Sequence, residues 1–174
     1  MSTLIVYATK HGATQGIAER IAAKLEEAGL EAEARPMGAV DNVAGYDAFV
    51  VGSAVYAAHW QKDATAFVQR NRTVLAGKPV WLFSSGPLGT ELTDAKGRDL
   101  KVVAEPKEIA EFEAAIGPKG HRVFFGVLDP GKLRFSERAI RKLAAARTML
   151  PEGDFRDWTE IDAWASDIAD DLAD

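Results

Sequence analysis

LIVYATKHGAT, residues 4–14, passes from a strand pattern through a turn into the start of a helix. Its first part, Leu4–Ala8, is a continuous apolar run, which is typical of a central strand that is buried on both faces. Ile17, Ile21 and Leu25 then recur every four residues, as on the buried face of a helix that ends at Gly29. The stretch therefore predicts the first strand and first helix of a parallel sheet.

Apolar runs and amphipathic stretches alternate along the rest of the chain. Glu31–Pro36 carries charges and a proline, which is typical of an edge strand. Three more strands are expected at Ala48–Ser53, Val80–Phe83 and His121–Leu128. Two helices are expected over 64–75 and 109–116. A third is expected after an N-cap at Ser136, with Ile140, Leu143 and Ala144 on its apolar face. A fourth is expected after Thr159, with Asp162 at the capping-box position. This order predicts an α/β fold with a five-stranded parallel sheet between two layers of helices.

The composition is that of one domain with a buried core. The chain has 174 residues, of which 47% are apolar, so we expect a single domain over residues 1–174. It has no cysteine, which excludes disulfides and thiolate metal sites, and its three histidines match no metal-ligand spacing. The net charge of −5 and the short apolar runs argue against nucleic-acid binding and a membrane span. We expect a cytoplasmic protein and leave open both a peripheral place at the inner membrane face and a homodimer.

The turn after the first strand has the features of an anion site. A helix N-terminus offers unpaired N–H groups and a partial positive charge, and a phosphate binds to both. The spacing matches neither a Walker A loop nor a Gly-x-Gly-x-x-Gly dinucleotide loop, which argues against ATP and NAD. A helix cap without a ligand is the alternative. The residues of this turn are Thr9, Lys10, His11, Gly12, Ala13 and Thr14.

Thr-x-x-Gly-x-Thr at this position resembles the phosphate loop of the flavodoxin family. Other stretches resemble the menaquinone-dependent protoporphyrinogen oxidase branch of that family, namely Tyr46-Asp47 with Val50–Ser53, Phe124–Gly126 with Leu128–Pro130, and Gly153–Trp158. The resemblance implies a doubly wound, flavodoxin-like sheet of order 2-1-3-4-5 with one FMN at the carboxyl ends of its strands. It also implies that residues 9–14 surround the FMN phosphate.

The resemblance implies two more flavin loops. One follows the third strand and comprises Ala54, Val55, Tyr56 and Ala57, with Tyr56 nearest the ring and His59 and Trp60 as further shielding groups. This loop has no glycine, and a β-carbon makes a positive φ angle costlier. The other follows the fourth strand and comprises Ser84, Ser85, Gly86 and Pro87, whose N–H groups would face the pyrimidine oxygens. No side chain is assigned a catalytic role.

Two functions remain open. One is an FMN-dependent oxidoreductase that passes reducing equivalents from a small organic substrate, such as a porphyrinogen or a quinol, to a quinone. The other is an electron carrier between redox partner proteins, for which a strongly acidic rim around the flavin is expected. Lys10, Lys62 and Asp63 make the loops almost neutral, which favours the oxidoreductase. Thr90–Pro106 is expected to be a mobile surface loop, with a functional lid as the alternative.

Overall fold

The central sheet has the predicted order. The computed structural model describes residues 1–142 and 150–173. Five parallel strands lie in the order β2-β1-β3-β5-β6, which is 2-1-3-4-5 when parallel strands alone are counted. Their bounds are Ser2–Ala8 (β1), Glu31–Pro36 (β2), Ala48–Tyr56 (β3), Val80–Ser85 (β5) and Gly120–Phe124 (β6). A sixth, unpredicted strand, β4 (His59–Trp60), pairs antiparallel with the end of β3.

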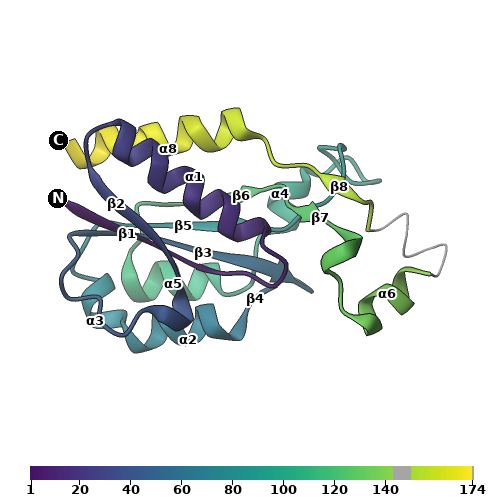
Figure 1. The fold of residues 1–174 in the computed structure, drawn as a ribbon, viewed down its shortest axis with the longest axis horizontal. Helices are drawn as coiled ribbons and strands as arrows, with labels where there is room; N and C mark the ends of the chain where they lie inside the picture. Colours follow the sequence, from purple (N-terminus) through teal and green to yellow (C-terminus); the bar gives the residue numbers. More distant parts are fainter. Residues whose placement is uncertain (143–149, 174) are drawn as a thin grey trace.

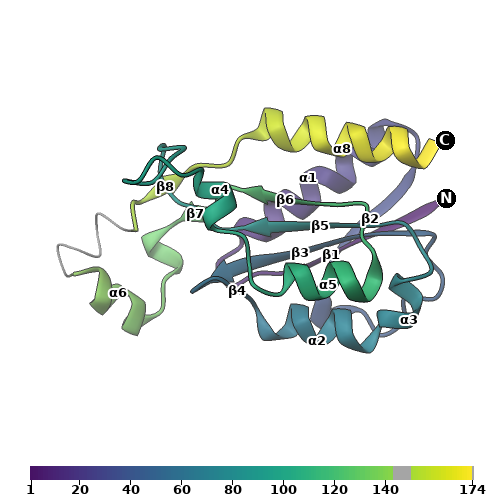
Figure 2. The ribbon, with the colours of Figure 1, turned by 180° about the vertical axis from the view of Figure 1, so that it is seen from behind.

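Helices cover both faces of the sheet (Figures 1 and 2). One face carries α1 (Ala13–Glu27) and α8 (Trp158–Ala173), and the other carries α2 (Lys62–Arg70), α3 (Arg72–Leu75) and α5 (Ile109–Ile116). Side chains alternate along a strand, so Ile5 packs with the first group of helices and Leu4 packs with the second. The three-layer α/β/α fold is therefore confirmed.

Gly52 allows the layer beneath α1 and α8 to close. A β-carbon on Gly52 would lie 2.0 Å from the Phe83 ring, so a larger residue cannot fit unless the ring moves. The Phe83 ring in turn packs against Phe124 at 6.2 Å and Trp164 at 6.3 Å between centroids. Gly52 thus lets an aromatic cluster lie directly on the sheet.

Several short elements gather beyond the carboxyl ends of the strands (Figure 1). They are α4 (Leu100–Val103), β7 (Val127–Leu128), η2 (Pro130–Lys132), α6 (Phe135–Arg141) and β8 (Gly153–Asp154); a further 3-10 turn, η1 (Met37–Ala39), follows β2. The predicted strand His121–Leu128 is wrong in extent, because it ends at Phe124 and resumes as β7, antiparallel to β8. The expected loop Thr90–Pro106 contains α4 and a Thr93–Asp99 bridge.

The predicted helix boundaries need three corrections. The expected helix over 64–75 is divided at Asn71, whose side-chain amide donates to the Phe67 carbonyl at 2.9 Å. Ser136 lies inside α6 rather than at its cap, and Leu143 and Ala144 fall outside the described residues. Helix α8 begins before Thr159, because Asp157 accepts the Glu160 N–H at 3.1 Å. Within the described parts of the chain, no helix is both long and apolar enough to cross a membrane.

Candidate functional site

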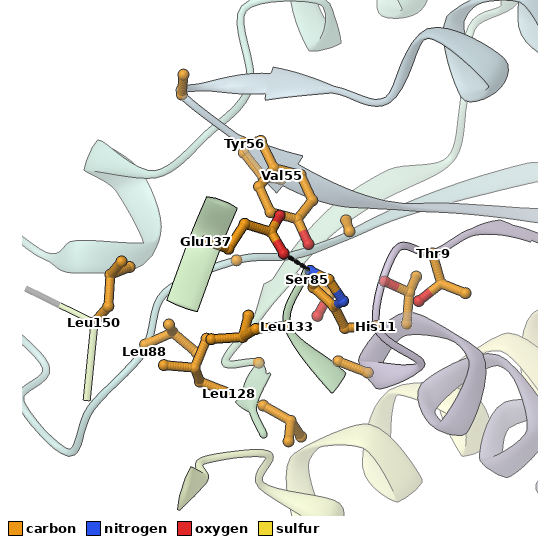
Figure 3. Close-up of a pocket in the computed structure, with 17 residues that line it drawn as sticks. Thr9, His11, Val55, Tyr56, Ser85, Leu88, Leu128, Leu133, Glu137 and Leu150 are labelled. Atoms are coloured by element: carbon orange, nitrogen blue, oxygen red, sulfur yellow. Dashed lines mark ion pairs between the residues drawn. The ribbon is translucent and has the colours of Figure 1, made fainter. Parts of the chain in front are cut away.

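A cavity of about 330 Å³ opens at the carboxyl ends of β1, β3 and β5 (Figure 3). Its volume lies within the range of small-molecule sites, roughly 300–1,000 Å³. The three predicted loops, far apart in the sequence, meet here because the carboxyl ends of parallel strands share one edge of the sheet. The predicted residues that line the cavity are Thr9, His11, Ala13, Thr14, Ala54, Val55, Tyr56, Ala57, Ser85 and Gly86.

A second part of the lining was absent from the sequence prediction. It consists of Leu88, Gly126, Val127, Leu128, Leu133, Glu137 and Leu150. The leucines gather on one side of the cavity, away from Thr9 (Figure 3). Val127 and Leu128 ended the predicted fifth strand at the same edge of the sheet, so strand position would have indicated them. No local pattern pointed to Leu133 or Glu137.

The N-terminus of α1 forms the polar end of the cavity. Gly12 turns the chain with φ 89°, and its N–H donates to Thr9 Oγ1 at 3.0 Å. Among residues 1–142 and 150–173, no side chain caps the helix, and the first turn of the helix has no acidic residue. Thr14 is fully buried, and its hydroxyl has no hydrogen-bond partner among the described residues. An unsatisfied buried hydroxyl costs about 1–3 kcal/mol, so this end of the cavity fits a ligand that accepts hydrogen bonds, such as a phosphate.

The loop predicted after the third strand is a hairpin. Residues Ala54–Tyr56 continue β3, and the turn itself comprises Ala57 with φ 51° and Ala58 with φ 63°. Two successive residues with positive φ are typical of a type I′ turn, in which glycine or asparagine is usual. The left-handed conformation costs an alanine about 1–2 kcal/mol. The chain thus adopts the costly conformation without a glycine.

Glu108 and Ser53 hold this hairpin in place. Glu108 accepts from the Trp60 N–H at 3.3 Å and lies 2.7 Å from His59 Nδ1, while Ser53 Oγ accepts from Gln61 N–H at 3.0 Å. The Trp60 ring is 4% exposed and packs against Phe112 at 5.2 Å, on the face of the sheet opposite α1. The expectation that Trp60 shields a ring in the cavity is therefore wrong.

The loop after the fourth strand also differs from the prediction. Ser84 and Ser85 belong to β5, so their side chains point to opposite faces of the sheet. Ser84 Oγ accepts from Trp60 Nε1 at 2.7 Å and lies 2.8 Å from His121 Nε2, away from the cavity. The Gly86 N–H donates to the Phe124 carbonyl at 3.1 Å, and Pro87 has no N–H. Neither Gly86 nor Pro87 therefore has a free N–H for a ligand, so the expectation that both would donate to the pyrimidine oxygens is wrong.

Lys10 and Gly12 do not line the cavity, but Lys10 belongs to an ion cluster at its polar end. Glu137 of α6 forms an ion pair with Lys10, lies 3.3 Å from His11 Nε2 and accepts the Arg134 N–H at 2.8 Å. The Lys10 hydrogen bond, followed by the Arg134 N–H and the charges of His11 and Lys10, lowers the pKa of Glu137 to about 2 against the cost of burial.

Tyr56 lies close to this cluster, and the charge of Glu137 affects the pKa of its phenol. The Lys10 ammonium is 5.1 Å from the centroid of the Tyr56 ring. Burial, followed by the negative charge of Glu137, raises the pKa of Tyr56 to about 12. The phenol therefore stays protonated at neutral pH and is available as a hydrogen-bond donor.

Comparisons with known proteins agree with this architecture. The Flavodoxin domain family model matches residues 4–150. Protoporphyrinogen IX dehydrogenase (quinone) of Escherichia coli (strain K12) is 24% identical over 180 residues, which cover 97% of this chain and 95% of that protein.

Two solved flavodoxins are similar in fold over the whole of both chains. One, from the domain Archaea, has a TM-score of 0.61 at 17% identity and covers 100% of each chain. The other, a mutant of the flavodoxin from Pseudomonas aeruginosa, has a TM-score of 0.62 at 18% identity and also covers 100% of each chain. With the family match spanning most of the sequence and the strand order in agreement, this chain belongs to the flavodoxin domain family.

Proposed function

We propose that this chain binds FMN in the cavity at the carboxyl ends of its strands and acts as an oxidoreductase with a quinone acceptor. One observation carries the proposal: a single cavity joins the uncapped N-terminus of α1 to a wall of leucines. The polar end suits a phosphate, and the apolar end suits flat rings. FMN, when bound, supplies one- and two-electron transfer that no protein side chain provides.

The phosphate would be held by the first turn of α1. Thr14 contributes the buried hydroxyl that lacks a partner in the part of the chain that the structure describes, and Gly12 lets the backbone come close to the ligand. Thr9 fixes the turn through its hydrogen bond with the Gly12 N–H. This arrangement fits the group, because it offers donors and a positive helix end without requiring a cation.

The ring would lie between the hairpin and the leucines. Val55 and Tyr56 form one side of the cavity, while Leu88, Leu128 and Leu133 form part of the other. The walls on both sides are largely apolar, and the protonated Tyr56 hydroxyl is a polar group that the hairpin contributes.

The similarity to a protein named as a quinone-dependent protoporphyrinogen IX dehydrogenase supports a quinone as the acceptor. We extend the proposal to a single FMN-binding domain over residues 1–174. The electrons would come from an organic substrate that can be oxidised by loss of hydrogen, such as a porphyrinogen.

Anaerobic reoxidation tests the acceptor. The protein is reconstituted with FMN, reduced by light, and mixed either with a menaquinone analogue or with a one-electron acceptor protein while visible spectra are recorded. We expect rapid reoxidation by the quinone. Bound FMN that the quinone reoxidises slowly, and the protein acceptor rapidly, would contradict the proposal and favour an electron carrier.

A pair of leucine variants makes this test specific to the cavity. Leu150 lines the cavity and is 38% exposed, whereas Leu92 is 68% exposed and lies outside the lining. Leu150→Glu is expected to slow quinone reoxidation roughly fivefold, because a charge at the wall disfavours an apolar acceptor. Leu92→Glu is the control and should leave the rate unchanged.

A further inference from the structure

Basic side chains crowd the N-terminus of α1. Lys10 and His11 precede the helix, and the Arg156 guanidinium donates to the Ala13 carbonyl at 3.3 Å. A β-carbon placed on Gly12 would lie 3.5 Å from Lys132 Nζ, so this ammonium lies directly over the turn. A helix N-terminus is the positive end of the helix dipole, and cations are unfavourable there unless an anion lies among them.

The carboxylates of this region neutralise only part of that charge. Asp154 pairs with Arg156 at 2.6 Å, and Glu137 pairs with Lys10 and His11. Lys132 has neither an ion pair nor a side-chain hydrogen bond within residues 1–142 and 150–173. The positive end of α1 therefore retains an unbalanced ammonium.

The buried hydroxyl of Thr14 is a second, independent sign of a ligand at this position. It lines the same cavity, is completely shielded from solvent and has no partner among the described residues. A phosphate monoester would satisfy this donor and balance the Lys132 ammonium at the same time.

We propose that Lys132 and Glu137 set the affinity of this site for the phosphate of its flavin, and that they act in opposite directions. Lys132 attracts the phosphate over Gly12. Glu137 opposes it, because its carboxylate lines the cavity, pairs with the Lys10 ammonium and lies 3.3 Å from His11 Nε2. The proposal rests on the proposed FMN function and adds the residues that select a phosphorylated flavin over an unphosphorylated one.

Riboflavin is the diagnostic ligand, since it has the same ring as FMN but no phosphate. Flavin-free protein is titrated with FMN and with riboflavin, and the quenching of flavin fluorescence gives each dissociation constant. Lys132→Met is expected to weaken FMN about tenfold, because it removes an exposed positive charge beside the turn that would hold the phosphate. Riboflavin affinity should be unchanged.

Glu137→Gln should have the opposite effect. Removing this charge is expected to strengthen FMN binding about fivefold and to leave riboflavin unchanged. Lys132 lies over Gly12 without lining the cavity itself. Lys78→Met is the control, because Lys78 lies 3.9 Å from Asp47, and these two residues precede β5 and β3 at the opposite edge of the sheet. It should change neither dissociation constant.

Salt gives a second readout that does not depend on comparing ligands. Added sodium chloride should weaken FMN binding to the unaltered protein, because salt screens the attraction between Lys132 and the phosphate. The same salt should weaken FMN binding to Lys132→Met less, because this attraction is absent from the variant. Equal effects on FMN and riboflavin, or no effect of either variant on FMN, would overturn the proposal while FMN binding itself persists. Absence of FMN binding by the unaltered protein would instead overturn the proposed function and this inference together.

Discussion

Glu137 Oε2 lies 3.3 Å from His11 Nε2, so helix α6 is joined to the turn before helix α1 (Figure 3). The same carboxylate pairs with Lys10 and raises the pKa of Tyr56 through its charge. Two separate segments of the chain thus meet in one ion cluster, and the hairpin that carries Tyr56 lies beside it. The polar end of the cavity is built from the carboxyl-terminal segment as well as from the glycine turn.

Glu137→Gln is expected to lower the free energy of unfolding of the flavin-free protein at neutral pH. The pKa of Glu137 falls from 4.5 to about 2 on folding, so its stabilising contribution is present above pH 4.5 and is lost as the pH falls towards 2. Urea unfolding of both proteins across this range measures the difference. Glu91→Gln, at an exposed position, is the control. A difference in unfolding free energy between the unaltered protein and Glu137→Gln that stays constant down to pH 2 would contradict the lowered pKa of Glu137.

His121 is expected to make the protein less stable in weak acid. Burial lowers the pKa of His121 from 6.5 and outweighs the opposing effect of Glu105. The unfolded chain therefore takes up a proton first, and stability declines as the pH falls below 6.5.

His121→Gln removes this titration. Its unfolding free energy should decline less than that of the unaltered protein between about pH 7 and about pH 5. Parallel declines for the unaltered protein and His121→Gln would show that another group is responsible.

Strand positions followed from the sequence, because buried parallel strands are continuous apolar runs and the charged Glu31–Pro36 marks an edge. The strand order followed from the resemblance to the flavodoxin family and is confirmed. Strand ends were less predictable. The extension of β3 to Tyr56 depends on pairing with β4, and apolar periodicity does not report such pairing.

The lining of the cavity was only partly predictable from the sequence, for a related reason. Thr9 to Thr14 form a local motif with its own chemistry, so a short window of sequence indicates them. Leu133 and Glu137 reach the cavity because the chain folds back over the carboxyl ends of the strands. That contact is set by tertiary packing and leaves no periodic signal.

Gly52→Ala is expected to destabilise the protein by roughly 1–3 kcal/mol or more, because the new β-carbon would overlap the Phe83 ring. Gly38→Ala is the matched control, since no atom in the described part of the chain lies within 4 Å of its β-carbon position. Thermal and urea unfolding of both variants measure the effect. Equal stabilities would show that Phe83 moves without cost.

Ala58→Gly is expected to stabilise the protein by about 0.5 kcal/mol, because relief of the left-handed alanine exceeds the added entropy of the unfolded chain. Ala58 has φ 63°, whereas Ala28 has φ −81°. Ala28→Gly should therefore destabilise the protein. Urea unfolding compares the two, and a loss of stability in both would mean that the hairpin turn is not strained.

The most direct test of FMN binding compares two buried threonines. Thr14 and Thr3 are both nearly or fully inaccessible and lack hydrogen-bond partners among the described residues, but only Thr14 lines the cavity. Flavin-free protein, Thr14→Val and Thr3→Val are each titrated with FMN while fluorescence is recorded. We expect one FMN per chain, affinity about tenfold weaker in Thr14→Val through loss of a hydrogen bond to a charged group, and no change in Thr3→Val. No FMN uptake, or equal affinities for all three proteins, would contradict the assignment of this cavity.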